Sequence, residues 1–275
     1  MQKSIRRILA AGVAAATALA LSACAGTAET PETVSLDTPL RVGALPVPAG
    51  QMLQFVQENL AEDAGIQIEF VEFSDYNTPN PALSDGSIDA NLFQHQAFLD
   101  KYNSEAGDDL VSLGQIYLPA AAFHSKKYKS FDELPEGAVI SIPKDPSNEA
   151  RALELLASEG IIEITEGADN ISGITSNPKN YEFQEVDNAT LPRTLDDNDA
   201  AFVTSSYAIP AQLTSETILL AEKEGSKYYN VLVTRPELQD DPRIQKLHEL
   251  LLSPEMAAYI DETWNGLILP GEVQQ

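Results

Sequence analysis

The stretch LRVGALPVPAGQMLQFVQENLAEDAGIQIEFVEF, from Leu40 to Phe73, decides the fold of this chain. It opens with an apolar run, which is followed by a turn rich in proline and glycine, PVPAG, at Pro46–Gly50. From Gln51 to Ala64 the apolar residues recur at helical spacing, and IQIEFVEF at Ile66–Phe73 alternates as a strand does. Two parallel strands joined by a helix, with a right-handed crossover, are the simplest arrangement that explains this order.

The same alternation of strands and helices continues along the chain. Further strands are predicted at Ile88–Phe93, Leu110–Leu118, Val139–Ile142, Ala200–Val203 and Val231–Val233. Helices are predicted at Gln94–Glu105, Asn148–Ser158, Arg243–Leu252 and Pro254–Trp264. No internal repeat is visible, so the pattern predicts an α/β fold with two lobes. We place the first lobe at residues 40–122 and 234–275, and the second lobe at residues 123–233.

The N-terminal segment has the pattern of an export signal. A short basic stretch precedes the apolar run Ile8–Leu21, which is too short for a comfortable membrane span. The run ends in LSAC, and its Cys24 is the single cysteine of the chain. LSAC resembles the lipobox of bacterial lipoproteins, in which the cysteine is acylated and the bond before it is cut. Residues 1–23 are therefore predicted to be a lipoprotein signal peptide, and Cys24 to carry a diacylglyceryl group with acyl chains such as palmitate, which anchors stably.

The remainder of the chain is strongly acidic. From Cys24 on it has 252 residues and a formal charge of −28, because residues 1–23 hold three of the 17 basic residues and none of the 42 acidic ones. This charge argues against binding to nucleic acid and against adsorption to anionic lipid. No cysteine follows Cys24, so no disulfide is expected, and no later run approaches the length of a transmembrane helix. Residues 24–39 are small, polar and acidic, which predicts a flexible tether.

Three stretches fall where ligands bind in open α/β sheets, beyond the carboxyl ends of strands and near helix N-termini. They are FSDYNTPNPAL (Phe73–Leu83), DANLFQHQAFLD (Asp89–Asp100) and PKDPSNEARALELL (Pro143–Leu156). The first two carry four aromatic rings, those of Tyr76, Phe93, His95 and Phe98. Core packing is the better explanation for any one ring taken alone. Four rings on two adjacent loops favour an apolar binding pocket.

The third stretch contains the features of a helix N-terminus followed by an arginine. Asp145 is suited to cap a helix, Pro146 to fill its first position, and Asn148 then lies in the first turn. Arg151 follows one turn in, near the helix end that already carries the positive end of the dipole. The arginine is then either solvated or faces an anion, and a ligand carboxylate would satisfy its guanidinium group.

Other classes of function fit the sequence less well. An enzyme would be expected to show a motif such as GxSxG, a P-loop or HExxH, or a free thiol, and the chain shows none of these once Cys24 is acylated. A metal site would need clustered ligands, but His95, His124 and His248 are the only histidines and are widely separated. An adhesive lipoprotein would not need Arg151 together with the aromatic loops. We expect no catalysis, metal or cofactor; the alternative is a metal-binding or adhesive surface lipoprotein with no amino acid ligand.

Several motifs resemble the NlpA/MetQ family of methionine-binding lipoproteins, which serve bacterial methionine ABC transporters. The motifs are FSDY, DANLFQH with a following aromatic residue, DPSNEARAL, NPKN (Asn177–Asn180), EVD (Glu185–Asp187), SYA (Ser206–Ala208) and YYNVLVTR (Tyr228–Arg235). The likeness runs from about Leu40 to near the C-terminus. It implies the two-lobed fold of periplasmic binding proteins (type II), with a ligand cleft between the lobes and no catalytic activity.

The resemblance also implies roles for residues at the polar end of a ligand. Arg151 is expected to bind the carboxylate of an amino acid, with Asn148 beside it. Asn230, within YYN, would help with the ammonium or the carboxylate. Thr204 stands where the family typically has an asparagine that contacts this end, and it offers a hydroxyl in place of an amide.

For the apolar end of a ligand, the resemblance implies that Tyr76, Phe93 and His95 wall the side-chain pocket. Phe98 stands where the family usually has tyrosine, which keeps the apolar wall but removes one hydroxyl. Burying a methionine side chain contributes about 1.5 to 3 kcal/mol, and sulfur against an aromatic edge about 0.3 to 1.5 kcal/mol. A micromolar affinity needs roughly 8 kcal/mol, so the charged end must supply much of the rest. Arg151→Ala is therefore predicted to cost more binding than Phe93→Ala.

The function that follows is that of a lipid-anchored receptor of an importer. It would be a monomer held to the membrane by Cys24, facing outside the cytoplasm at the cell surface or in the periplasm. It would deliver L- or D-methionine, a related amino acid or a methionine-containing peptide to a membrane permease and its ATPase subunit. Nucleic acid is not an expected partner.

Overall fold

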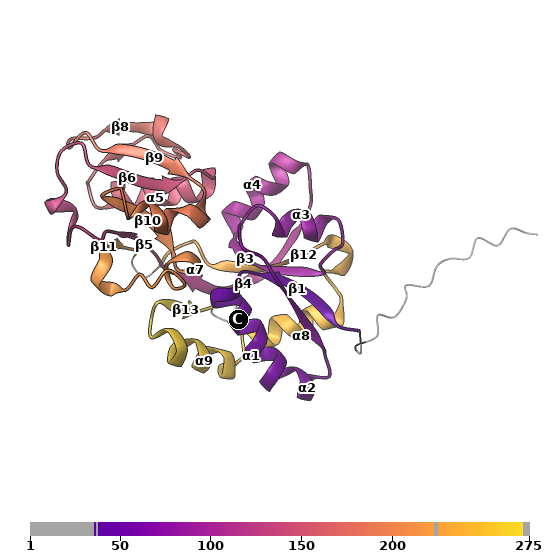
Figure 1. Ribbon diagram of the computed structural model, residues 1–275. Helices are drawn as coiled ribbons and strands as arrows, with labels where there is room; N and C mark the ends of the chain where they lie inside the picture. The colour runs from indigo at the N-terminus through magenta and orange to yellow at the C-terminus, as the bar shows by residue number, and fades with distance from the viewer. Residues whose placement is uncertain (1–35, 37, 223–224, 272–275) are drawn as a thin grey trace, which may run out of the picture. The chain divides into compact units, whose positions relative to one another are not determined.

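Two β-sheets organise the chain, and each has its own hydrophobic core. The computed structural model describes residue 36 and residues 38–222 and 225–271. The predicted signal peptide, the lipidation site Cys24 and most of the predicted tether, residues 24–39, lie outside the described residues. Figure 1 shows the six-stranded sheet around the labels β1, β3, β4, β12 and β13, and the five-stranded sheet around the labels β5, β6, β9, β10 and β11.

The first sheet contains the stretch that decides the fold. In spatial order its strands are β13 (Ile268–Pro270), β4 (Val111–Pro119), β12 (Asn230–Thr234), β3 (Ala90–His95), β1 (Leu40–Ala44) and β2 (Ile68–Glu72). β1 and β2 are parallel, as predicted, and pair in register from Leu40 with Ile68 to Ala44 with Glu72. The predicted helix between them is two helices, α1 (Gln51–Asn59) and α2 (Ala61–Ala64), because Leu60 leaves the helical conformation.

The second sheet is formed by a continuous part of the chain. Its strands, in spatial order, are β11 (Ile218–Ala221), β5 (Ala121–His124), β10 (Ala200–Thr204), β6 (Val139–Pro143) and β9 (Glu182–Val186). A separate antiparallel pair is formed by β7 (Glu163–Ile164) and β8 (Ile174–Ser176). We call the elements around the six-stranded sheet the first lobe and those around the five-stranded sheet the second lobe.

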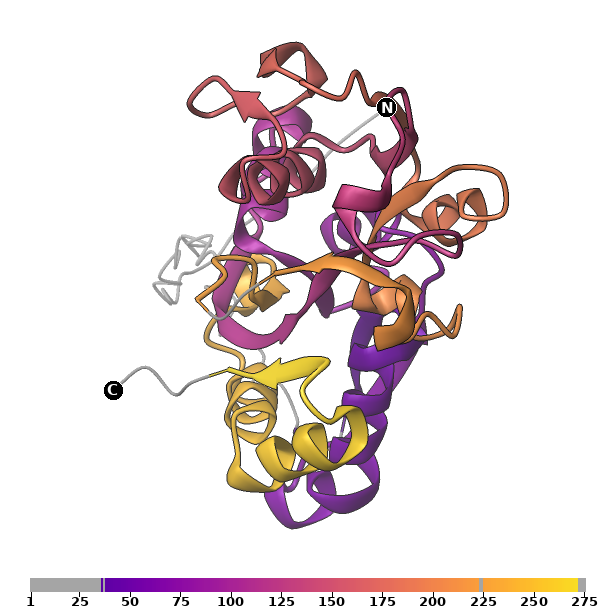
Figure 2. The same cartoon turned by 90° about the vertical axis from the view of Figure 1, so that its left-hand side faces the viewer.

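The remaining helices cover these sheets. They are α3 (Pro79–Ser84), α4 (Gln96–Ala106), α5 (Pro146–Ser158), α6 (Leu191–Thr194), α7 (Ser205–Ala208), α8 (Pro242–Leu251) and α9 (Pro254–Trp264). Short helical turns connect other elements: η1 (Pro46–Gly50), η2 (Phe131–Glu133), η3 (Ile171–Gly173), η4 (Asn188–Thr190), η5 (Ser215–Thr217) and η6 (Pro236–Leu238). Figures 1 and 2 both show α8 and α9 at the same end of the first lobe as α1 and α2. Their apolar faces meet there in one core that includes Met52, Leu247 and Trp264.

Strand β12 corrects one predicted lobe boundary. Residues 231–233 were placed in the second lobe, but β12 pairs antiparallel with β3 and with β4 in the middle of the first sheet. The return to the first lobe therefore occurs before Asn230. The short strand β5, which begins at Ala121, was not predicted at all, and it already belongs to the second sheet.

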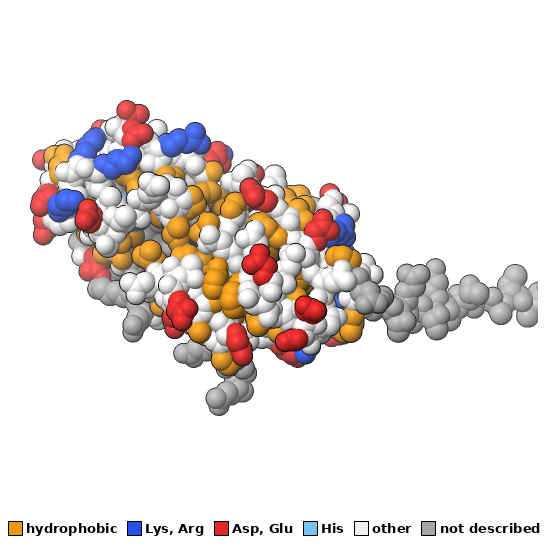
Figure 3. All heavy atoms as spheres, turned by 60° about the horizontal axis from the view of Figure 1, so that its bottom comes forward, with side chains coloured by type: hydrophobic (Ala, Val, Ile, Leu, Met, Phe, Trp, Pro, Cys, Tyr) orange, Lys and Arg blue, Asp and Glu red, His pale blue; other side chains and the backbone are white. Residues whose placement is uncertain are grey.

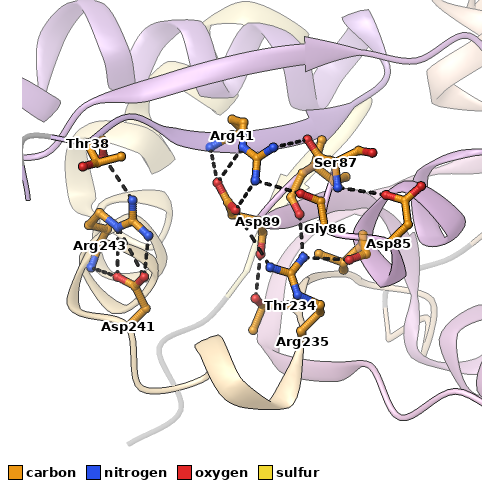
Figure 4. Close-up of polar contacts among 12 residues, drawn as sticks. Thr38, Arg41, Asp85, Gly86, Ser87, Asp89, Thr234, Arg235, Asp241 and Arg243 are labelled. Carbon is orange, nitrogen blue, oxygen red and sulfur yellow. Dashed lines mark hydrogen bonds and ion pairs between the residues drawn. The ribbon is translucent and has the colours of Figure 1, made fainter. Parts of the chain in front are cut away.

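A polar cluster ties together the strands of the first lobe, and Figure 4 shows its members. The carboxylate of Asp89 accepts hydrogen bonds from the backbone N–H of Arg41, at 2.9 Å, and from its guanidinium group, at 2.7 and 3.1 Å. The hydroxyl of Thr234 donates to the backbone carbonyl of Asp89 at 2.7 Å. Nearby, the buried pair Asp241 and Arg243 holds the start of α8 against the carbonyl of Thr38. These contacts join β1, β3 and β12 near the ends of the strands that contain Arg41 and Thr234.

Acidic side chains are spread over the face of the molecule shown in Figure 3 and do not gather in one patch there. This distribution agrees with the excess of 42 acidic over 17 basic residues. Among the described residues, no helix is both long and apolar enough to cross a membrane.

Candidate functional site

A narrow cavity of about 10 Å³ lies between the two lobes. Seven of its lining residues come from the first lobe: Tyr76, Phe93, Gln94, His95, Phe98, Pro119 and Asn230. Three come from the second lobe: Asn148, Arg151 and Thr204. All eight residues predicted from the sequence to contact a ligand therefore lie around one cavity. Gln94 and Pro119 are additional.

Aromatic rings form the apolar wall. The ring centroids of Tyr76, Phe93 and Phe98 lie 5.7 to 6.1 Å from one another, in tilted or edge-to-face contacts. Tyr207, from the second lobe, adds a fourth ring 5.0 Å from that of Tyr76. Offset and edge-to-face contacts are the favoured arrangements of such rings. Tyr76, Phe93 and Phe98 line the cavity, and Tyr207 packs against this group of rings without lining the cavity itself.

His95 stands at the end of β3 and caps helix α4. Its Nδ1 accepts a hydrogen bond from the backbone N–H of Phe98 at 3.2 Å. Its Nε2 lies 3.2 Å from Oδ1 of Asn148 in the second lobe. Burial, followed by the nearby charge of Arg151, lowers the pKa of His95 to about 3. The imidazole is therefore neutral at physiological pH, and because Nδ1 accepts, Nε2 carries the proton that it donates to Asn148.

Helix α5 positions the two polar residues that the second lobe contributes from its sequence DPSNEAR. Asp145 caps the helix, as predicted, because its side chain accepts from the backbone N–H of Asn148 at 3.0 Å. The same carboxylate oxygen accepts from the side-chain amide of Asn148, which fixes that side chain in place. Asn148 and Arg151 lie three positions apart and so share one face of the helix, the face that lines the cavity.

Arg151 is buried, with 1% of its surface exposed. Of the two environments considered for it, the solvated one is wrong, and the anion that it faces is a carboxylate of the protein itself. Its Nε donates to Oε1 of Glu222 at 2.7 Å and its Nη2 to Oε2 at 2.5 Å. Nη2 also donates to the carbonyl of Pro119 at 3.0 Å, and the guanidinium carbon lies 4.7 Å from the ring centre of Tyr228. Among the described residues, Nη1 has no hydrogen-bond partner.

Glu222 and Tyr228 contact Arg151 behind the cavity lining, and neither is among the site residues predicted from the sequence. Tyr228 contacts residues of both lobes. Its ring lies next to the guanidinium group of Arg151 in the second lobe and packs edge-on against His95 of the first lobe, at 4.9 Å. Its hydroxyl donates to Glu154 on α5 at 2.7 Å. The motif YYN contained the signal for Tyr228, but only Asn230 was taken from it. A single acid after the apolar strand ILLA is too common a pattern to have indicated Glu222.

Two sets of buried hydrogen bonds hold lining residues of the cavity, Gln94 and Asn230, in place. The side chains of Gln94, Asn80 and Asn91 form a closed network of amide hydrogen bonds of 2.6 to 3.0 Å, and all three residues are buried. Asn230, opposite His95 in the pairing of β12 with β3, donates to the hydroxyl of Tyr117 at 2.8 Å. Because buried amides with satisfied partners rarely rearrange, Gln94 and Asn230 are held in fixed orientations.

Within residues 36, 38–222 and 225–271, no group of three or more histidine, cysteine, aspartate or glutamate side chains is placed to hold a metal ion. His124 instead contacts the hydroxyl of Thr217 at 2.9 Å, far along the chain from His95 and His248.

Two lobes of α/β structure with a cavity between them are the architecture of the two-lobed substrate-binding proteins. The chain belongs to the NlpA lipoprotein family, whose family model matches residues 40–272. The D-methionine-binding lipoprotein MetQ of Escherichia coli strain K12 is 36% identical over 240 residues, which cover 84% of this chain and 88% of that protein.

Solved structures show the same likeness. A nutrient-binding protein from Burkholderia cenocepacia bound to methionine has a TM-score of 0.82 and 36% identity, covering 84% of this chain and 99% of that one. A periplasmic substrate-binding protein of an ABC transporter from Coxiella burnetii has a TM-score of 0.81 and 37% identity, covering 84% and 100%. The two-lobed fold predicted from the sequence, and the family that it resembles, are confirmed.

Proposed function

We propose that this protein is the lipid-anchored substrate-binding protein of an ABC importer and that its ligand is methionine, a closely related amino acid or a methionine-containing peptide. The observation that carries the proposal is the position of Arg151. The guanidinium group of this residue, which is 1% exposed, donates through Nε and Nη2 and has no hydrogen bond from Nη1 to a described residue, and it lines a cavity whose other wall is aromatic. An amino acid with an apolar side chain has the complementary distribution of charge and apolar surface.

In this proposal the ligand carboxylate accepts from Nη1 of Arg151. The amides of Asn148 and Asn230 lie around the same end of the cavity and serve the carboxylate or the ammonium group. Tyr76, Phe93 and Phe98 enclose the side chain, and a thioether sulfur is favoured against the ring edges that they present. Charge-assisted hydrogen bonds are worth about 1.5 to 3 kcal/mol each, so the polar end contributes as much as the apolar end.

Ligand capture would involve closure of the lobes. The cavity walls come from both lobes, and two polar contacts join them directly, Tyr76 with Thr204 and His95 with Asn148. A ligand that contacts both walls favours the arrangement in which they are close together. The closed form would then dock on a membrane permease, whose ATPase subunit drives uptake.

The chain would reach its membrane through Cys24. The support is the sequence of residues 1–24 and the family to which the chain belongs. Cys24→Ala should release the protein into the medium or the soluble periplasmic fraction, which fractionation and immunoblotting would show. Retention of the variant at the membrane would contradict lipid anchoring and would leave the ligand proposal unaffected.

The binding proposal is tested by calorimetry with L-methionine, D-methionine and short methionine-containing peptides. We expect at least one of them to bind with micromolar affinity or better. Arg151→Ala should weaken binding by about 100-fold or more, because it removes charge-assisted bonds, and Phe93→Ala by about tenfold, because it removes only part of the apolar wall. Circular dichroism would check that each variant is folded. No binding of any of these ligands by the wild-type protein, or a larger loss for Phe93→Ala, would contradict the proposal.

A further inference from the structure

Glu222 is the counter-ion of the arginine in the cavity, and its geometry is that of a two-pronged clamp. Both carboxylate oxygens accept from the guanidinium group of Arg151, at 2.7 and 2.5 Å. The second oxygen also accepts from the backbone N–H of Ala121 at 3.2 Å. The side chain of Glu222 is 9% exposed, so water screens this ion pair little.

The ion pair also holds the two chain segments that connect the lobes. One connection runs from β4 through Ala120 to β5, and its ends contact the pair through the carbonyl of Pro119 and the N–H of Ala121. The other connection runs from β11 to β12, and Glu222 is its first residue. Glu222 therefore fixes the orientation of Arg151 relative to both connections and leaves only Nη1 directed elsewhere.

The pairing decides the net charge of the site. Among the ten residues that line the cavity, Arg151 alone carries a full charge at neutral pH, because His95 is neutral there. Glu222 does not line the cavity, but it cancels the charge of Arg151 at hydrogen-bond distance. The buried pair of Arg151 and Glu222 thus has no net charge before a ligand enters. A ligand with a net charge would bring an uncompensated charge into the site, and burying such a charge is costly.

We propose that Glu222 is a positioning and specificity-determining residue, which orients Arg151 and restricts the cavity to zwitterionic ligands over anionic ligands of the same shape. This inference rests on the proposed function, since it assumes that Arg151 receives a ligand carboxylate. It adds that the ligand is a zwitterion: a free amino acid, or another ligand that carries both an ammonium and a carboxylate group.

The test compares two ligands that differ only at the ammonium group, L-methionine and 4-(methylthio)butanoate. Their affinities are measured by calorimetry for the wild-type full chain and for Glu222→Gln, which removes the charge and keeps the size. We expect the preference for methionine over the anion to shrink by at least about tenfold in this variant, because Arg151 is then an uncompensated cation. Glu222→Asp, which restores the charge, should recover the wild-type preference even if both affinities fall.

Glu154→Gln is the matched control. Glu154 lies on the same helix as Arg151 and bonds Tyr228 and Lys227, but it makes no ion pair with Arg151. Its substitution should leave the preference unchanged. A preference in Glu222→Gln within about threefold of wild type, or an equal change in Glu154→Gln, would overturn the inference.

A measurement on the wild-type protein keeps the inference testable if Glu222→Gln does not fold. Binding of 4-(methylthio)butanoate should be accompanied by proton uptake, because protonation offsets the added negative charge, and binding of methionine should not. Calorimetry in two buffers of different ionisation enthalpy measures this uptake, and equal values for the two ligands would overturn the inference. If the wild-type protein binds none of L-methionine, D-methionine and the methionine-containing peptides, the proposed function itself has failed.

Discussion

The phenol oxygen of Tyr76 and the hydroxyl oxygen of Thr204 lie 3.0 Å apart, although one residue belongs to the first lobe and the other to the second. Both residues are buried, so neither oxygen can exchange this partner for bulk water without the lobes moving apart. Burial also raises the pKa of the Tyr76 phenol, which keeps it protonated and able to donate. This contact is a direct link between lobe closure and the wall of the cavity. Thr204, one of the residues predicted from the sequence to contact a ligand, forms one side of it.

Thr204→Val should weaken ligand binding by about twofold to tenfold. The substitution keeps the shape of the side chain and removes the contact of the buried Tyr76 hydroxyl with Thr204, while the contact with Ser206 remains, so the cost in the closed arrangement is that of one hydrogen bond, about 0.5 to 1.5 kcal/mol. Tyr207→Phe is the control, since the Tyr207 hydroxyl is buried and has no hydrogen-bond partner among the described residues. Calorimetry should find its affinity close to that of wild type. Equal effects of the two substitutions would show that the contact between Tyr76 and Thr204 does not contribute.

His95 should not titrate between pH 8 and pH 5. Its pKa is lowered to about 3, chiefly by burial, against an ordinary value of 6.5. In the window between these values the unfolded chain binds a proton that the folded protein does not, so this residue makes stability fall as the pH drops. Nuclear magnetic resonance of the ring nitrogens should show a neutral imidazole protonated at Nε2 throughout. A midpoint near pH 6.5 would contradict the burial and tautomer described here.

Glu149→Gln should stabilise the protein at pH 8 and have little effect near pH 4. Glu149 is 2% exposed, and burial is the main cause that raises its pKa to about 7. The folded protein therefore binds a proton between about pH 4.5 and 7 that the unfolded chain does not, and stability falls as the pH rises through this window. An uncharged glutamine keeps the bond from the N–H of Ile171 and avoids the loss, a gain of about 1 to 3 kcal/mol at pH 8. Urea unfolding at both pH values, with the exposed Glu182→Gln as control, would measure it.

Asp89→Asn should lower the free energy of unfolding by about 1 to 3 kcal/mol and leave ligand affinity unchanged. The substitution weakens three hydrogen bonds from Arg41 within the first lobe. Neither Arg41 nor Asp89 lines the cavity. Glu237→Gln is the matched control. This substitution breaks the ion pair between Glu237 and Arg235, which lies beside the cluster of Arg41 and Asp89. The Glu237 side chain is 64% exposed, so the free energy of unfolding should change by close to zero. A change in methionine affinity for Asp89→Asn would indicate coupling that the contacts do not show.

Much of the fold could be predicted because it is encoded locally. The unit from β1 to β2 has an apolar strand, a turn, an amphipathic helix and a second strand in immediate succession, and each has its own pattern. Helix α9 was predicted with its observed ends, Pro254 and Trp264, because Ser253 caps its start and Asn265 ends it in a left-handed conformation. The predicted boundary between a strand and a helix was wrong where polar residues are buried. Gln94 and His95 were assigned to a helix, but they extend β3 into the cavity wall.

The members of the candidate site could be predicted, but their partners could not. The motifs around Tyr76, His95 and Arg151 are each continuous in sequence, so they could be matched to the motifs of a known family. The pairing of Arg151 with Glu222 joins residues 71 positions apart, and no pattern in either segment indicates the other. The place of β12 depends in the same way on distant strands. Pairing over such separations is decided by the packed structure and not by local propensity.

Strand β12 also has a consequence for how the molecule is made. It lies in the middle of the first sheet, between β3 and β4, yet it follows the end of β4 by about 110 residues. During synthesis from the N-terminus, β3 and β4 cannot pair with β12, the strand between them, until nearly all of the chain has been made. The second lobe, built from one continuous segment, has no such delay and can complete its core earlier. The second lobe can therefore complete its core before the first lobe, although most of the first lobe is synthesised earlier.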